Sequence, residues 1–501
     1  MLTKTPFGPE FWVTQFRAVQ DFYTGLSRYQ ADFLVPYLIS LVYFSRAEMA
    51  RDPAHMGNNA FKDYLSLLEF STDLWGRGVK GSVNALGDFL NSESQSYARV
   101  LQKSMTGQGA DELADYLSGL ATRMSGVSHT LPDAVRDIEP AFGFHFDTGN
   151  HPLAAETDRF RLFRILPDAP GIKSDATAKP VLILPPYVLG CNILGFLPGD
   201  RKSYAHAFAN RGVPTYIRVM KDIRDYPACQ TMTMEEDTLD TRYFCDSIKR
   251  AHGKPVTLNG YCQGGFLGLC QILSGELDGL VDALITCVAP MDGTRSKGLK
   301  GFLDKLPRRF NDLAFGTKTL PNGNRVADGK LMGWVYKLKS IEDQAPLALF
   351  LRDMLMVAKM TDRLDRISNT AAALNYWLRN ERADIPLALT EMSFASYNIP
   401  ITADGTLPVT LFGRQLTLKD FPGKSIPWLL CYGEDDDLVE KEAALAPLDH
   451  IDVETTPFPK GHVAIATSWS HPDSPYPLHG RFGPENQYRG PVRFHLDLNE
   501  S

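Results

Sequence analysis

The six residues from 260 to 265, Gly-Tyr-Cys-Gln-Gly-Gly, place one cysteine among three glycines in the pattern G-x-C-x-G-G. A thiolate attacks carbonyl carbons readily, so Cys262 is a candidate nucleophile. Glycines suit a sharp turn from a strand into a helix, where bulky side chains would collide. The first N–H groups of such a helix lower a thiol's pKa and can hold an oxyanion. A cysteine among small residues is also often a buried apolar filler, so its context must decide between the two interpretations.

A nucleophilic thiol needs a base, and the base needs an acid that orients it. An apolar stretch from Trp428 runs into four successive carboxylates at 434–437, and a later stretch runs into Gly461-His462. The order nucleophile, acid, histidine, each after a strand, is typical of α/β-hydrolases, in which the turn at the nucleophile is called the elbow. Some of the four carboxylates are expected to be merely solvated. Asp292, after an earlier strand, is the alternative acid, and His450 is expected at the surface.

The elements that must position these residues alternate between strands and helices from about residue 141. This rhythm predicts a mostly parallel central sheet with helices on both faces, that is, an α/β fold of the α/β-hydrolase class. Residues 293–417 lack regular strands and are predicted to be a cap inserted over the active site. Residues after about 470 are expected to form a surface tail. The predicted strands are 159–166, 180–186, 215–219, 256–260, 284–289, 426–431 and 453–458, and the predicted helices are 203–210, 235–251, 264–273 and 440–445.

Residues 1–140 carry apolar side chains at helical spacing and predict a helical N-terminal region, with the catalytic domain at 141–501. The region could simply pack on the main domain, or it could be a docking or dimerisation surface, and the amphipathic pattern leaves both open. Its most apolar run, from Phe33 to Phe44, is too short to span a bilayer and is expected to be a core helix. No apolar signal-peptide core follows the N-terminus.

Composition excludes several classes of function. The chain has 501 residues, a net charge of −7 and seven cysteines without a C-x-x-C pair. An acidic chain is a poor partner for nucleic acid, whose phosphates need a basic surface. The irregular cysteines favour reduced thiols in the cytoplasm over disulfides or a zinc site. No metal cluster or phosphate-binding loop is visible, so we expect neither a metal nor another cofactor.

The chain resembles the polyhydroxyalkanoate synthases, which are thiol-dependent polymerases of the α/β-hydrolase fold, over roughly residues 140–470. Their lipase-like box matches Gly260–Gly265, and their Gly-His matches Gly461-His462. Their opening strand with Pro-Pro-aromatic and Ile-Leu matches Val181–Tyr187 with Ile193-Leu194. Their late "G..D..V" segment matches Gly433, Asp436 and Val439. The resemblance thus implies the triad Cys262, Asp436 and His462. It also implies 3-hydroxyacyl-CoA and a growing polyester as partners, a homodimer, and association with polymer granules.

In such a mechanism the backbone N–H groups of Gln263 and of Val188, in the loop after Pro186, are expected to hold the oxyanion. Three features depart from the family. The cap region matches only loosely, around Trp377 to Pro386. No tryptophan-led stretch is seen near residues 218–225, and Asp437 stands where the family often has histidine. The same triad could therefore serve an intracellular polyhydroxyalkanoate depolymerase or a thioesterase. A third alternative is a weakly catalytic, granule-associated accessory protein that acts through its helical region.

Overall fold

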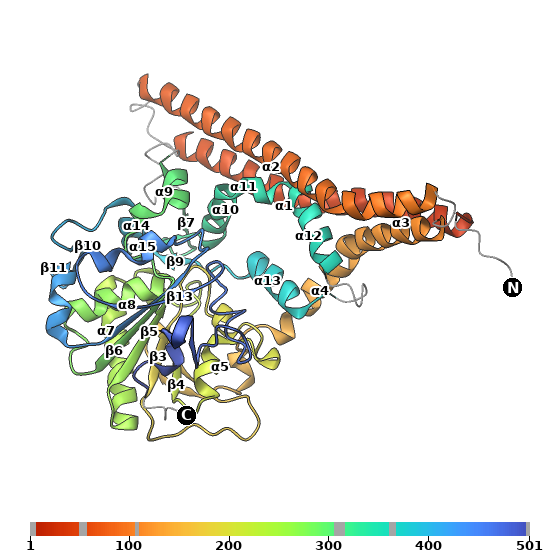
Figure 1. The fold of residues 1–501 in the computed structure, drawn as a ribbon. Coiled ribbons are helices and arrows are strands. Elements are labelled where there is room, and N and C mark those ends of the chain that lie inside the picture. Colours follow the sequence, from red (N-terminus) through yellow and green to blue (C-terminus); the bar gives the residue numbers. More distant parts are fainter. Residues whose placement is uncertain (1–6, 50–57, 106–109, 305–315, 360–366, 497–501) are drawn as a thin grey trace. The chain divides into compact units, whose positions relative to one another are not determined.

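The computed structural model describes residues 7–49, 58–105, 110–304, 316–359 and 367–496. The chain forms two compact units (Figure 1). The first, which we call the helical unit, consists of Met1–Pro140 and Gly333–Arg379, and the second, the catalytic unit, consists of Ala141–Met332 and Asn380–Ser501. Residues 293–417 are thus shared between the units, and their role as a cap stays a prediction.

The helical unit is built on four helices in its first part, α1 (Pro9–Met49), α2 (Asn58–Met105), α3 (Ala110–Ser125) and α4 (Leu131–Asp137). Two more come from its second part, α11 (Ile341–Gln344) and α12 (Pro346–Lys359). The buried core joins both parts through Tyr29, Phe89, Phe350 and Met354. The Tyr29 hydroxyl donates to Asp353 at 2.5 Å within this core. The helical character predicted for residues 1–140 is therefore confirmed over α1–α4.

The apolar run from Phe33 to Phe44 lies in α1, and its side chains from residue 35 onward are outside the described residues. Over the portion of the chain that the structure describes, no helix has the combined length and apolarity that crossing a membrane requires.

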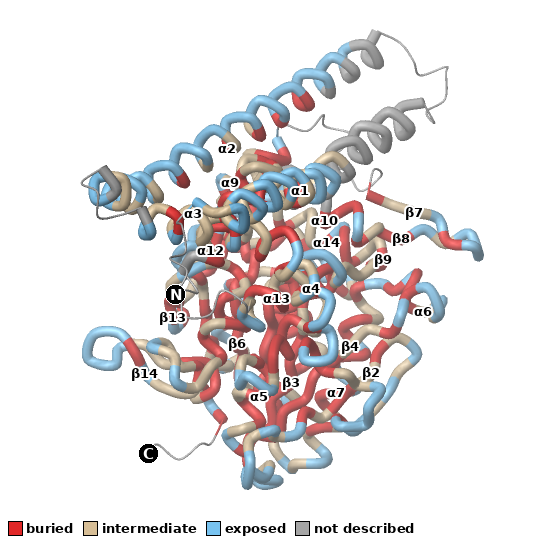
Figure 2. Tube along the Cα trace, turned by 90° about the vertical axis from the view of Figure 1, so that its right-hand side faces the viewer, coloured by how far each residue is buried: buried red, intermediate tan, exposed pale blue. Residues whose placement is uncertain are grey.

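An eight-stranded sheet forms the centre of the catalytic unit, in the order β1-β2-β4-β3-β5-β6-β12-β13. The strand β2 runs antiparallel to its neighbours β1 and β4, and the remaining pairs are parallel. The central strands appear as a buried block in Figure 2, because their apolar side chains are covered on both faces. The strands are β1 (Leu153–Glu156), β2 (Phe160–Ile165), β3 (Val181–Leu184), β4 (Thr215–Met220), β5 (Val256–Tyr261), β6 (Val281–Cys287), β12 (Trp428–Gly433) and β13 (Glu454–Phe458).

The crossover helices follow the strands as the sequence predicts. The helix α7 begins with a capping box in which Thr233 and Glu236 bond each other's backbone N–H groups. This strand order, with its antiparallel second strand and crossover helices, is the α/β-hydrolase fold, so the predicted fold class is confirmed. The helices of this unit are α5 (Tyr204–Ala209), α6 (Pro227–Gln230), α7 (Met234–His252), α8 (Gln263–Ser274), α9 (Lys297–Leu303), α14 (Leu387–Asn398) and α15 (Lys441–Ala444). The chain passes between the two units within α10 (Gly329–Lys339) and α13 (Asn369–Asn380).

Two sequence predictions are wrong. Residues 293–417 do contain strands, in a three-stranded sheet of β7 (Thr317–Thr319), β8 (Arg325–Ala327) and β9 (Ile385–Pro386) and in the hairpin of β10 (Thr406–Leu411) and β11 (Arg414–Thr417). Residues after 470 are not a surface tail, because they form the hairpin of β14 (Arg481–Phe482) and β15 (Tyr488–Arg489) and bury Val492 and Phe494. Short strands and isolated apolar residues between prolines give too weak a periodic signal to be recognised.

Candidate active site

Cys262 lies at the apex of a sharp turn between β5 and α8. Its backbone has φ 52° and ψ −122°, a conformation that L-residues rarely adopt. Such a conformation costs on the order of 1–3 kcal/mol and persists only when the surroundings enforce it. The Cys262 N–H donates to the Cys287 carbonyl at 2.7 Å, and its own carbonyl accepts from Gly265 N–H at 2.9 Å. These bonds hold the thiol outward at the end of the sheet, in the geometry of a nucleophile elbow.

The glycines around Cys262 are required by close backbone contacts. A Cβ atom on Gly260 would lie 2.3 Å from the Gly264 carbonyl oxygen, and one on Gly264 would lie 2.3 Å from the Leu184 carbonyl oxygen. Neither backbone oxygen can move without shifting a strand or a helix. The pattern G-x-C-x-G-G is therefore explained by helix α8 passing directly against β5 and the end of β3.

Asp436 is buried and accepts three hydrogen bonds after β12. One carboxylate oxygen accepts from the backbone N–H groups of Leu438 and Val439, both at 2.9 Å. The other oxygen is 2.8 Å from Nδ1 of His462. The two backbone bonds fix the carboxylate, so its second oxygen is held toward the imidazole. Asp435, its neighbour, is exposed to solvent.

His462 reaches Asp436 because the loops after β12 and β13 are joined to each other. The N–H of Glu434 donates to the Phe458 carbonyl at 2.8 Å, and that of Asp435 donates to the Lys460 carbonyl at 3.3 Å. The carbonyl of His462 itself accepts from the Tyr261 hydroxyl at 2.8 Å. Tyr261 immediately precedes Cys262, so this bond ties the histidine loop to the elbow.

The electrostatics of His462 suit a base that takes the thiol proton. Burial lowers its pKa, but the Asp436 carboxylate and the nearby Cys262 thiol outweigh burial, and the net effect raises the pKa well above its ordinary value. Its Nε2 atom is buried and has no hydrogen-bond partner among the described residues. A raised imidazole pKa beside a thiol favours the thiolate–imidazolium pair.

The alternative residues have other roles in the structure. The buried Asp292 caps a short helical turn by accepting from the Thr294 N–H at 3.1 Å, and it also accepts from Arg295 at 3.2 Å and from the Ile401 N–H at 3.3 Å. Both carboxylate oxygens of Asp292 therefore accept hydrogen bonds from groups other than His462. His450 lies beside Gly405.

The two predicted oxyanion donors lie on segments that touch. Gln263 is the first residue of α8, so its backbone N–H has no acceptor within the helix. Val188 is the second residue of a turn closed by the Gly190 N–H and the Tyr187 carbonyl at 3.4 Å, a position whose N–H such a turn does not use. The loop that carries Val188 begins at the contact between Gly264 and the end of β3.

Sequence reasoning missed a buried ionic network under this loop. The Tyr187 hydroxyl donates to Asp237 and accepts from Arg218 at 2.6 Å. Arg218 also pairs with Asp237 at 3.0 Å, and Gln271 donates to Asp237 at 2.7 Å. The network joins β4, α7 and α8 to the residue before Val188. Its signal in the sequence is an arginine in the middle of the otherwise uncharged strand 215–219.

A second missed contact involves α14. The side-chain amide of Gln263 donates to the Ser393 hydroxyl, and a Cβ atom on Gly293 would lie 2.2 Å from the Tyr397 ring. The helix α14 therefore lies directly over the residue that follows the nucleophile. The seven cysteines are all unpaired, as predicted.

Comparisons with known proteins leave the family open. No family model matches the chain, and no curated protein matches it. Solved structures that resemble it include a carboxylesterase of the thaumarchaeon Nitrososphaera gargenis, with 12% identity, 63% of this chain and 92% of the other covered, and a TM-score of 0.35. A putative aryl esterase from Burkholderia cenocepacia has 12% identity, coverage of 63% and 92%, and a TM-score of 0.31. The thioesterase domain of the curacin biosynthetic pathway has 10% identity, coverage of 64% and 95%, and a TM-score of 0.34. At these values we draw no functional conclusion from them.

Proposed function

We propose that this protein is an acyltransferase that forms a thioester with its substrate on Cys262. The observation that carries the proposal is the cysteine at the strained apex of the elbow, with an Asp436–His462 pair at 2.8 Å beside it. A thiol nucleophile suits a thioester substrate, because the bond that breaks and the bond that forms are of the same kind. Together with the resemblance in the sequence, this favours the polymerisation of 3-hydroxyacyl-CoA into polyhydroxyalkanoate.

In the proposed first step His462 accepts the thiol proton, and Asp436 holds the Nδ1–H tautomer that leaves Nε2 free to do so. The Cys262 thiolate attacks the thioester carbonyl, and the N–H groups of Gln263 and Val188 hold the oxyanion. The intermediate collapses, and coenzyme A leaves with the proton from His462. In the second step His462 removes the proton from a hydroxyl, whose oxygen takes the acyl group and releases Cys262.

The runner-up is a hydrolase, either a polyhydroxyalkanoate depolymerase or a thioesterase, in which water takes the acyl group from the same acyl-enzyme. The partial exposure of Cys262 in the catalytic unit favours this alternative, because a solvated thioester is open to attack by water. Homodimer formation and association with granules stay predictions from the resemblance. The cytoplasmic location, inferred from the cysteines, and the alternative of an accessory protein also stay predictions.

The test is to incubate the full-length protein with 3-hydroxybutyryl-CoA and to measure free coenzyme A, polymer and free acid. Coenzyme A with polymer supports the synthase, and coenzyme A with free acid supports the hydrolase. Cys262→Ala is expected to abolish both. The matched control is Cys191→Ala, because Cys191 is also half-buried but burial and Glu381 raise its pKa to about 12, which keeps it protonated. Equal activity in wild type and Cys262→Ala would refute the proposal.

A further inference from the structure

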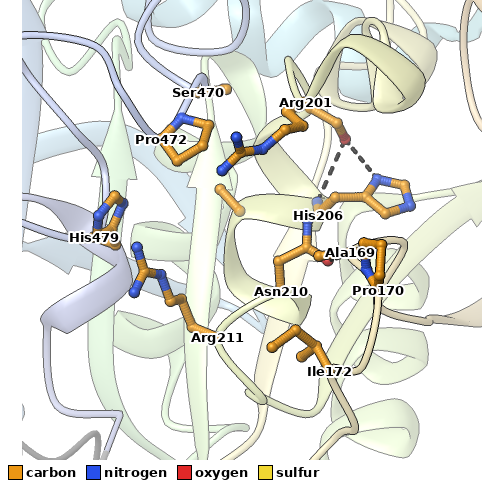
Figure 3. A pocket seen from close by; sticks show the side chains of 12 residues that line it. Ala169, Pro170, Ile172, Arg201, His206, Asn210, Arg211, Ser470, Pro472 and His479 are labelled. Atoms are coloured by element: carbon orange, nitrogen blue, oxygen red, sulfur yellow. Dashed lines mark hydrogen bonds between the residues drawn. The ribbon is translucent and has the colours of Figure 1, made fainter.

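A cavity of about 290 Å³ lies beside α5, separate from the elbow (Figure 3). Its lining includes none of the three triad residues. Apolar side chains such as Ile172 and Ala207 form part of its wall, and Arg201, Arg211 and His479 add nitrogen-bearing side chains. The volume is at the low end of the range of about 300–1,000 Å³ found for small-molecule sites, so it suits a small ligand.

Positive charge is concentrated around this cavity. Arg201 and Arg211 stand before and after α5, and Arg493 comes from the C-terminal segment, where its guanidinium donates to the His479 carbonyl. Burial lowers the pKa of Arg211, and the charges of Arg493 and Arg201 lower it further. Burial and the same arginines lower the pKa of His479 to about 4, so this histidine is neutral near pH 7.

The carboxylates nearby offset this charge only in part. Asp473 approaches Arg201 at 3.5 Å, and both side chains are more than half exposed. Asp168 is bonded to the Asn210 side chain at 2.7 Å. Within the part of the chain that the structure describes, Arg211 pairs with no carboxylate. Three guanidinium charges less those of Asp473 and Asp168 leave one positive charge, which favours an anionic ligand.

We propose that this cavity binds a small phosphate monoester, with its phosphate against Arg201 and Arg211 and its organic body against the apolar wall. Guanidinium groups bind phosphate through paired hydrogen bonds, and a monoester carries close to two negative charges at pH 7. Like charges held together repel, and a bound dianion removes that repulsion. The site does not depend on the acyl-transfer reaction proposed for Cys262.

The test is isothermal titration calorimetry of the full-length protein with AMP and, separately, with inorganic phosphate, at constant ionic strength set with chloride. We expect saturable binding at one site, with AMP bound more tightly than phosphate. Arg211→Gln and Arg201→Gln are each expected to raise the Kd for AMP at least tenfold. Arg250→Gln is the matched control, because it removes an exposed arginine of α7 that pairs with Asp246 and does not line the cavity.

A second variant probes the cavity without altering any charge. Ala207→Leu fills part of it and is expected to weaken AMP more than inorganic phosphate. The proposal is overturned if neither ligand gives saturable binding, or if Arg211→Gln and Ala207→Leu, folded by circular dichroism, bind AMP as wild type does. If the protein binds inorganic phosphate but not AMP, the proposal of a phosphate monoester is wrong and free phosphate is the ligand.

Discussion

Replacing Asp436 with asparagine should inactivate Cys262 by reversing the tautomer of His462. The aspartate accepts three hydrogen bonds, two from backbone N–H groups at 2.9 Å and one from the imidazole at 2.8 Å. Asparagine has one oxygen and one NH₂ group. If its NH₂ faces the backbone, the buried N–H of Val439 and the half-buried N–H of Leu438 lose their acceptor, at about 1–3 kcal/mol for the buried group. If its oxygen faces the backbone, only the imidazole must adapt, so this arrangement prevails.

In that arrangement the NH₂ group faces Nδ1 of His462, which must then be unprotonated to accept the bond. The imidazole proton moves to Nε2, the atom that has to accept the thiol proton. A triad that loses its orienting carboxylate in this way slows by roughly 10⁴-fold, which corresponds to about 5.5 kcal/mol of activation free energy. The loss of the carboxylate charge also removes the main influence that raises the pKa of His462.

Alkylation by iodoacetamide measures this effect without knowledge of the substrate, because the rate follows the thiolate population. In wild type near pH 7 we expect rapid labelling of Cys262, and in Asp436→Asn a rate at least about 100-fold slower, since alkylation depends on thiolate formation but not on later proton transfer. Asp435→Asn, an exposed neighbour, is the control and should label as wild type. Undiminished labelling of Cys262 in a folded Asp436→Asn protein would refute the proposed role of Asp436.

Three further predictions concern stability. Gly264→Ala should destabilise the catalytic unit by about 3 kcal/mol, because its Cβ would lie 2.3 Å from the last carbonyl oxygen of β3. Gly301→Ala is the control and should not destabilise it, because the space around Gly301 is open. Chemical denaturation of the two variants measures the difference. Arg218→Met should lower the free energy of unfolding by about 3–5 kcal/mol, because it leaves the Asp237 carboxylate buried without its partner. The loss should be smaller at low pH, where Asp237 is protonated. Adding Asp237→Leu should restore much of the lost stability in a double-mutant cycle. Burial lowers the pKa of His206 to about 4, so the folded state resists protonation there, and this residue should cost about 3 kcal/mol of stability as pH drops from 6.5 to 4. In His206→Gln the melting temperature should therefore fall less over this range than in wild type, with the remaining fall due in part to His479.

The sheet and the elbow were predictable because their signals are local and strong. Buried parallel strands such as Val181–Leu184 are short apolar runs between turn residues, and their ends fall within a few residues of the prediction. The place of His462 follows from its position after the last strand, since the carboxyl ends of parallel strands meet at one edge. The same argument leaves four carboxylates at 434–437, and only the family resemblance singles out Asp436. The structure adds the 2.8 Å contact and the cross-bonded loops that produce it.

The ionic network and the small sheets were not predictable, because they depend on pairings between distant residues. Arg218 is marked by its place in an uncharged strand, but Asp237 looks like a surface charge in the sequence, and only the fold shows that the two are buried against each other. Ser393 carries no sequence signal at all, because its importance comes from α14 crossing over Gln263. Strands of two or three residues, such as β9, are defined by their partners rather than by their own composition.

The residues expected to determine whether this site makes polymer or free acid differ from the residues proposed to carry out the reaction. Hydroxyl and water acceptors use the same thioester, the same imidazole and the same oxyanion donors, so changes at Cys262, His462 or Asp436 reduce transfer and hydrolysis together. What differs is the access of water to the acyl-enzyme. Within the catalytic unit, α14 is held over the residue after Cys262 by the bond between Gln263 and Ser393, so we expect its side chains to affect that access. Variants of α14 are therefore where the ratio of polymer to free acid should change while the rate of coenzyme A release does not.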